Sequence, residues 1–111
     1  MKISETFTAT IYLGTRAGYS GEVTSLETVR QWLRTYVDAT GLCVTITPTE
    51  FIYTKGSEPG VIVGLINYPR FPSSANSIRT KATEIAEGLM ALLKQQRVTV
   101  VYPDQTVMFE N

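Results

Sequence analysis

A short segment of this chain occurs twice, and the spacing between the two copies constrains the fold more than any other feature of the sequence. The segment VTITP at residues 44–48 returns as VTVVYP at residues 98–103. Each copy follows a stretch with helical periodicity and precedes a second short apolar run, at residues 51–53 and 107–109. An offset of about half the chain predicts two copies of one small supersecondary unit.

The first predicted unit begins with a strand. Residues 7–13 alternate apolar and polar side chains, which is typical of a strand with one buried face. Residues 26–37 carry apolar side chains at helical spacing. Residues 42–47 are rich in β-branched side chains and predict a second strand, which Pro48 bends or ends because proline has no N–H to donate. Residues 50–54 then predict a short third strand.

The second predicted unit follows the same plan. Residues 55–60 have the composition of a turn, and residues 61–67 are almost continuously apolar, as in a central strand buried on both faces. An apolar stripe over residues 78–93 predicts a longer helix. Residues 98–102 and 106–109 complete the unit as two strands separated by turn residues.

Together these elements predict an α+β fold in a single domain, residues 1–111, with an internal repeat at roughly 7–54 and 61–110. We expect two pseudo-symmetric β-α-β-β units that form a four-stranded core sheet, with both helices on one face and short edge strands. The other face of the sheet would be apolar on its central strands and would lack a helix to cover it. We therefore expect a homo-oligomer, because a monomer would leave that face in water.

Composition narrows the class of protein. Charged residues make up 18% of the chain, and 10 basic side chains balance 10 acidic ones, so a broad nucleic-acid interface is not expected. The sequence has no apolar run long enough to span a membrane, and the first residues resemble no signal peptide. We expect a cytoplasmic protein. Cys43 is the single cysteine and is interpreted as a small hydrophobic residue in a strand.

Two loops that each join a strand to a helix contain the candidate ligand-binding residues, namely Arg16, Tyr19, Asn67, Tyr68, Arg70 and Phe71. Each loop places an arginine next to an aromatic residue, and we expect both loops at the same end of the sheet. Two guanidinium groups, two helix N-termini and several rings could bind a phosphate, a carboxylate or a nucleotide base. The alternative is that the rings pack structurally and that the arginines are solvated or pair with Glu22 and Glu58.

The residue types also limit the chemistry. The chain has no histidine, so a Ser-His-Asp relay, a Cys-His relay and a histidine metal site are not expected. A single cysteine cannot form a thiolate metal cluster. The sequence therefore predicts no metal and no cofactor, and it indicates no catalytic residue.

The doubled β-α-β-β plan resembles the tautomerase superfamily of the macrophage migration inhibitory factor type. The residues that carry the resemblance are 44–48, then 56–59 leading into the apolar strand 61–66, and 97–102. The resemblance implies a homotrimer, favoured over a dimer, whose short strands pair across subunit boundaries. The catalytic amino-terminal proline of that family has no counterpart, because Lys2 follows Met1 and no proline precedes Pro48. A plain ferredoxin-like fold is the rival interpretation.

Two functions follow from these expectations. The first is a non-catalytic, oligomeric binding protein for a small anionic ligand, a nucleotide or a protein partner. The alternative is a tautomerase-like or isomerase-like enzyme with a non-proline base at a subunit boundary. The absence of a proton-transfer group with a suitable pKa makes the first hypothesis the main prediction.

Overall fold

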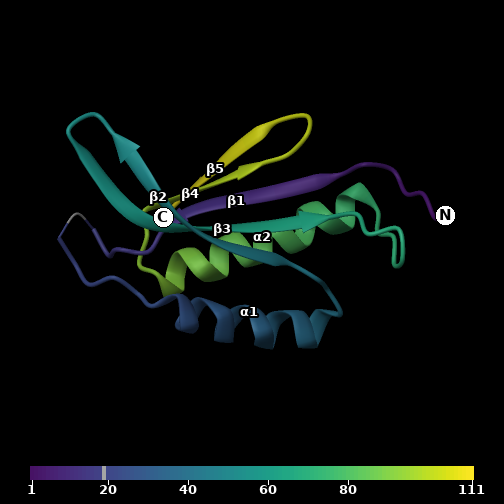
Figure 1. Ribbon diagram of the computed structural model, residues 1–111, viewed down its shortest axis with the longest axis horizontal. Helices are drawn as coiled ribbons and strands as arrows, with labels where there is room; N and C mark the ends of the chain where they lie inside the picture. Colours follow the sequence, from purple (N-terminus) through teal and green to yellow (C-terminus); the bar gives the residue numbers. More distant parts are fainter. Residues whose placement is uncertain (19) are drawn as a thin grey trace.

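The computed structural model describes residues 1–18 and 20–111 as one antiparallel sheet with two helices (Figure 1). The elements are, in chain order, β1 (Thr8–Gly14), α1 (Leu26–Thr40), β2 (Thr45–Tyr53), β3 (Gly56–Ile66), α2 (Ala75–Leu92), β4 (Arg97–Val101) and β5 (Thr106–Glu110). The strands lie in the order β2-β3-β1-β4-β5, and each is antiparallel to its neighbours. Both helices lie on the same face of the sheet (Figure 1).

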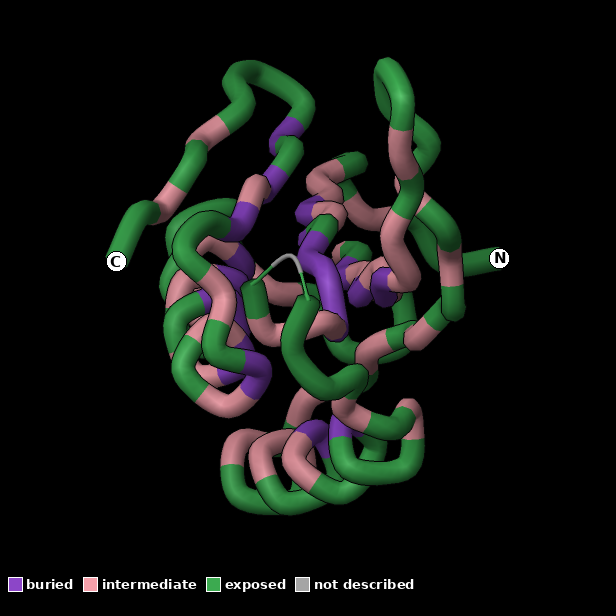
Figure 2. Tube along the Cα trace, turned by 90° about the vertical axis from the view of Figure 1, so that its left-hand side faces the viewer, coloured by how far each residue is buried: buried purple, intermediate pink, exposed green. Residues whose placement is uncertain are grey.

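The core lies between this sheet and the helices. Alternate residues of the central strands point toward the helices and are buried, as the period of two in their sequences requires: Ala9, Ile11, Leu13, Val61, Val63, Leu65, Val98 and Val100. Helix α2 contributes most of the opposing side chains, including Ile78, Ile85 and Leu89, whereas α1 buries only Val29 and Leu33. Figure 2 shows the α1 tube exposed along most of its length.

Local sequence explains where the helices begin. The side chain of Ser25 caps α1 by accepting a hydrogen bond from the backbone N–H of Thr28, and Ser74 caps α2 in the same way through Ser77. Helix α1 ends at Gly41, whose φ of 69° lies in the left-handed region that glycine adopts without strain. Within the part of the chain that the structure describes, neither helix is long and apolar enough to cross a membrane.

The predicted α+β class, with two helices and an antiparallel sheet, is confirmed. The sheet has five strands, however, and the expected four-stranded core and pseudo-symmetry are not confirmed. The first half of the chain forms β1-α1-β2, whereas the second half forms β3-α2-β4-β5. The halves differ because residues 50–54 do not start a new strand: β2 runs without interruption through Pro48 to Tyr53. Pro48 is tolerated there because β2 is an edge strand with one unpaired side.

The predicted turn at residues 55–60 is also wrong in extent. The chain reverses at Thr54 and Lys55, and Lys55 adopts a φ of 66°. Strand β3 begins at Gly56 and includes Pro59. The carbonyl of Pro59 accepts from the N–H of Thr15, so the missing N–H of Pro59 faces the β1 side, where that strand has ended. Proline therefore removes no hydrogen bond to β2.

The sheet face away from the helices is mixed rather than apolar. Register and alternation place a row of threonines and glycines on it, with a few larger apolar residues between them: Thr8, Thr10, Thr45, Thr47, Thr49, Thr99, Gly14, Gly60, Gly64, Tyr12, Ile62 and Ile66. The β2–β3 and β4–β5 hairpins both project to this side (Figures 1 and 2). Charged side chains on this face gather where β1 ends.

Candidate functional site

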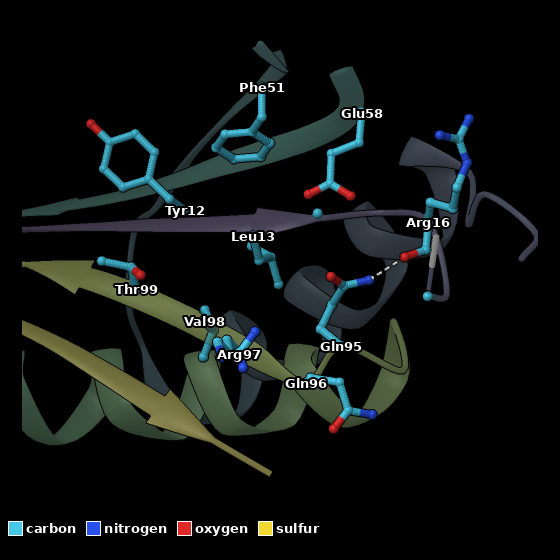
Figure 3. A pocket seen from close by; sticks show the side chains of 12 residues that line it. Tyr12, Leu13, Arg16, Phe51, Glu58, Gln95, Gln96, Arg97, Val98 and Thr99 are labelled. Carbon is cyan, nitrogen blue, oxygen red and sulfur yellow. Dashed lines mark hydrogen bonds between the residues drawn. The ribbon is translucent and has the colours of Figure 1, made fainter. Parts of the chain in front are cut away.

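A pocket of about 360 Å³ lies at the carboxyl end of β1, on the open face of the sheet. Its lining comes from four strands, the loop after β1 and the segment before β4: residues 12–14, Arg16, Gly18, Phe51 of β2, Glu58 of β3, and residues 95–99. Figure 3 shows the rings of Tyr12 and Phe51 and the carboxylate of Glu58 above the β1 ribbon, with Gln95 and Arg97 below it. Larger hollows of about 490 and 560 Å³ lie beside α1. The first contains Glu27, whose carboxylate already accepts hydrogen bonds from Arg30 and Gln31 of the same helix.

Two facing glycines form the floor of this pocket. Gly14 of β1 pairs with Gly60 of β3 in the antiparallel register. A Cβ atom on Gly60 would lie 2.2 Å from Cε2 of Phe51, so the absence of a side chain lets that ring lie over the sheet. A Cβ atom on Gly14 would lie 2.9 Å from Oε1 of Gln95 and 3.1 Å from Oε1 of Glu58. Both oxygens therefore approach the same glycine.

Hydrogen bonds fix the orientation of the Gln95 amide. Its Nε2 donates to the backbone oxygen of Arg16 at 2.7 Å and to that of Leu93 at 3.1 Å. With both donors used, the amide oxygen is the atom turned toward Gly14 and the pocket. The same bonds join the loop after β1 to the segment before β4, so Gln95 holds the two sides of the pocket together.

Glu58 adds a negative charge beside this amide oxygen. Its side chain forms no ion pair with any residue in the described part of the chain. The pocket thus presents two acceptor oxygens, one of them anionic, next to the rings of Phe51 and Tyr12. Acceptors and aromatic faces together are suited to a cationic ligand group.

Cationic side chains complete the pocket. Arg97 lies on β4, on the other side of β1 from Glu58, and its Nε lies 3.4 Å from Oε2 of Glu110 on β5. Arg16 also lines the pocket, and Figure 3 shows its side chain extending away from Gln95. No group of three or more acidic or cysteine side chains gathers anywhere in residues 1–18 and 20–111. The lining of the pocket thus combines acceptor oxygens with two guanidinium groups.

The structure separates the two loops that the sequence was expected to bring together. Strands β1 and β3 are antiparallel neighbours, with Thr8 opposite Ile66 and Gly14 opposite Gly60. The loop after β1 and the loop after β3 therefore lie at opposite ends of the sheet, and the prediction of one shared site is wrong in this respect. Of its residues, Arg16 lines the pocket described above, and Tyr19 lies outside the described residues.

The remaining predicted site residues form a separate cluster. The amide of Asn67 donates to the backbone oxygen of Glu5 and accepts from the N–H of Ser73, both at 2.8 Å, which ties the loop to the amino-terminal segment. Tyr68 and Phe71 pack with ring centroids 6.0 Å apart, and Arg70 lies 6.0 Å from the Phe71 ring. These contacts account for the residues structurally, and a ligand-binding role for them stays a prediction.

A neighbouring thiol affects Tyr68. A hydrogen bond with Cys43, together with partial burial, raises the pKa of the Tyr68 hydroxyl. Cys43 is exposed rather than packed in a strand, because β2 begins two residues later. The interpretation of Cys43 as a strand residue is therefore wrong.

Sequence reasoning missed the residues that make the pocket. Glu58 was considered as a partner for an arginine, Arg97 only as part of the segment 97–102 that carries the family resemblance, and Gln95 not at all. The available signal was the pair of glycines, Gly14 and Gly60, but their meaning depends on the β1–β3 register. A lone glutamine after a helix carries no sequence signal of this kind.

Comparisons with known proteins give a match in structure only. Neither the known protein-family models nor the curated protein sequences include a match to this chain. Among solved structures, the fold is similar to that of a phage SAM lyase in complex with S-methyl-5'-thioadenosine, with a TM-score of 0.78 and 17% identity over 96% of this chain and 90% of the lyase chain. A structure described as the phage SAM lyase in its apo state gives a TM-score of 0.80 and 18% identity, over 95% and 89% of the two chains.

These structures correct the main functional prediction. Both similar structures are of an enzyme, and one of them is in complex with S-methyl-5'-thioadenosine, so the prediction of a non-catalytic binding protein is wrong. The findings favour the alternative hypothesis, an enzyme. At this identity the likeness establishes the fold alone, so the substrate must be argued from the pocket.

Proposed function

We propose that this protein is a lyase that cleaves S-adenosylmethionine (SAM) and releases S-methyl-5'-thioadenosine. The observation that carries the proposal is the convergence of the Glu58 carboxylate and the Gln95 amide oxygen on Gly14, beside two aromatic rings. This arrangement suits a cation, and SAM carries a sulfonium and an ammonium group. The shared fold with a phage SAM lyase supports the same substrate.

The aromatic residues would hold the nucleoside. A purine ring stacks on an aromatic side chain with a gain of roughly 1–3 kcal/mol. Phe51 lies over Gly60, and Tyr12 is the next open-face residue along β1, so both rings border the space that Glu58 and Gln95 face. The nucleoside would therefore lie along β1, with the sulfonium and the ammonium group of the amino-acid end directed toward the acceptor oxygens.

The product defines the bond that breaks. S-methyl-5'-thioadenosine keeps the methyl and adenosyl groups of SAM, so the bond from sulfur to the four-carbon amino-acid chain is cleaved. The bonding electron pair goes to sulfur, which becomes a neutral thioether. Without added water, the carbon chain must either close on its own carboxylate or lose a proton from the neighbouring carbon. The role of Glu58 and Gln95 is to bind and orient the cation so that one of these routes is favoured.

The proposal is tested by incubating the protein with SAM and measuring S-methyl-5'-thioadenosine by liquid chromatography with mass detection. The mass of the second fragment confirms that water is not incorporated. Glu58→Gln keeps the shape and removes the charge, and we expect kcat/KM to fall by about tenfold or more, since hydrogen bonds to charged groups contribute roughly 1.5–3 kcal/mol.

Glu50→Gln is the matched control. Glu50 lies on the same hairpin, paired with Pro59, but between Thr49 and Phe51 it points to the opposite face. We expect Glu50→Gln to retain full activity. Absence of product with the wild-type protein, or equal activity of the Glu58→Gln variant and the wild type, would overturn the proposal.

We also propose that the protein is a homo-oligomer, with a trimer favoured over a dimer, as the resemblance to the tautomerase superfamily implies. The exposed edges of β2 and β5 and the open sheet face support self-association, because unpaired strand edges are available for pairing with another chain. Zero net charge gives little repulsion between copies. Mass spectrometry under native conditions tests this proposal, and a stable monomer at micromolar concentration would contradict it.

A further inference from the structure

We propose that Arg97 breaks its contact with Glu110 and binds the carboxylate at the amino-acid end of the substrate. Arg97 is then the residue that selects intact substrate over product. This inference rests on the proposed function. SAM carries a carboxylate as well as two cationic groups, so a pocket that holds all of it needs a cation placed opposite Glu58.

The sheet places Arg97 in that position. Glu58 precedes Gly60, the partner of Gly14, by two residues, and its side chain reaches back toward Gly14. Strands β3 and β4 flank β1 on its two sides, and neighbouring strands lie about 4.8 Å apart, so β3 and β4 are separated by roughly 10 Å. The residue between them at the end of β1 is Gly14, which fills none of this space. Two long side chains that reach inward from such strands can contact an ammonium and a carboxylate borne on one carbon atom.

The present partner of Arg97 holds it weakly. The contact with Glu110 is made by Nε at 3.4 Å, and the two side chains are 63% and 60% exposed. An ion pair of this kind contributes little, because water screens both charges. The terminal nitrogens of Arg97 have no hydrogen-bond partner within residues 1–18 and 20–111. A carboxylate can therefore use the planar guanidinium fork in the bidentate geometry that arginine favours.

Arg79, in contrast, has a guanidinium group that neighbouring side chains hold in place. Its guanidinium packs against the rings of both Phe7 and Tyr102, with Cζ 4.8 and 4.7 Å from their centroids, and Nη2 donates to Asp104 at 2.5 Å. Only 27% of that side chain is exposed. Arg97 has none of these constraints, and it lines the pocket that contains Glu58.

The chemistry of the product gives this contact a function. S-methyl-5'-thioadenosine has neither the carboxylate nor the ammonium group, so cleavage removes the ligand atoms that Arg97 and Glu58 bind. The intact substrate is held at both ends, whereas the nucleoside product is held by its aromatic contacts alone. Arg97 thus favours substrate over product in the competition for the pocket.

Calorimetric binding of two ligands tests the inference. Sinefungin is a non-cleavable analogue that keeps the cationic centre and the amino-acid end, and S-methyl-5'-thioadenosine lacks that end. We expect Arg97→Gln to raise the Kd of sinefungin by about tenfold or more and to change that of S-methyl-5'-thioadenosine by less than about twofold. Arg97→Lys keeps a charge but loses the fork, and should give an intermediate Kd for sinefungin.

Two further variants provide the controls. Arg34→Gln removes an equally exposed arginine, 4.0 Å from Asp38 on α1, and should change neither Kd. Glu110→Gln removes the competing carboxylate and should leave sinefungin binding unchanged or strengthen it. An Arg97→Gln variant that binds sinefungin as wild type does, or that weakens both ligands equally, overturns this inference while the proposed function stands. Failure of the wild-type protein to bind either ligand overturns both.

Discussion

Substitution of Gly14 by alanine should strongly weaken ligand binding while changing the stability of the fold only slightly. The added Cβ would lie 2.9 Å from Oε1 of Gln95 and 3.1 Å from Oε1 of Glu58, so both side chains must move out of the pocket floor. The backbone itself tolerates alanine, because Gly14 is not in the left-handed region. We therefore expect a loss of ligand affinity of more than about tenfold, since the two acceptor oxygens no longer converge on one point.

The stability change follows from the same contacts. If Gln95 rotates away, its bonds to Arg16 and Leu93 are lost, at about 1 kcal/mol each or less. Replacing glycine lowers the entropy of the unfolded chain and returns roughly 0.4–1 kcal/mol. The net destabilisation should be about 1.5 kcal/mol or smaller, which corresponds to a shift in Tm of about 6–12 °C at most for a domain of this size.

Thermal unfolding and sinefungin binding measure these two effects on the same variant. Gly64→Ala is the matched control. Gly64 lies on the same sheet face but does not line the pocket. An added Cβ would lie 2.5 Å from Oγ1 of Thr45, a side-chain atom that can move. Gly64→Ala should therefore bind ligand as the wild type does. If Gly14→Ala binds normally, or if both variants lose binding alike, the glycine floor is not what allows Glu58 and Gln95 to bind ligand.

Two further substitutions test the packing between the helices. Gly88→Ala places a Cβ 2.2 Å from Cζ2 of Trp32. Overpacking of this kind costs roughly 1–3 kcal/mol, whereas the gain in helix propensity is about 1 kcal/mol. Urea unfolding should therefore show a net loss of stability. A Gly88→Ala variant more stable than wild type would contradict the contact. Burial and the hydrogen bond to Glu84 at 2.5 Å raise the pKa of Tyr36, so the stability that this hydroxyl contributes is present below pH 10 and is lost as the pH rises beyond it. Urea titrations at pH 8 and pH 11 should show a smaller loss for Tyr36→Phe than for wild type, and equal losses would show that the raised pKa does not affect folding.

Periodicity predicted the core of this protein well. The alternation over residues 7–13 gave the buried row Ala9, Ile11 and Leu13, and the helical stripe over residues 78–93 gave the buried face of α2. These predictions succeed because each depends only on the local period of side-chain burial. The residues on each buried row are also uniformly apolar, so no polar partner outside the element is needed to interpret them.

Strand boundaries were predicted poorly because proline was taken as a local signal. Whether Pro48 and Pro59 interrupt a strand depends on which neighbour would have accepted the missing hydrogen bond. Pro48 lies on an edge strand, and Pro59 faces a side where β1 has already ended. Both facts belong to the sheet order, which the sequence of a single strand does not contain. The predicted repeat is not confirmed, and one reason is that β2 continues through Pro48, where a separate short strand was expected.

The candidate site depends on long-range register even more strongly. Gly14 and Glu58 are 44 positions apart in sequence and Gln95 lies 37 positions beyond Glu58, yet both side-chain oxygens approach one glycine. The expected two-arginine site failed because antiparallel pairing of β1 and β3 sends the loops that follow them to opposite ends. The same pairing brings the start of β3 beside the end of β1, which is why Glu58 lies in the pocket. The direction in which β1 and β3 pair thus determines which polar residues lie close together. In this chain the residues brought together are not two arginines but a carboxylate and an amide, whose oxygens suit a cationic ligand group.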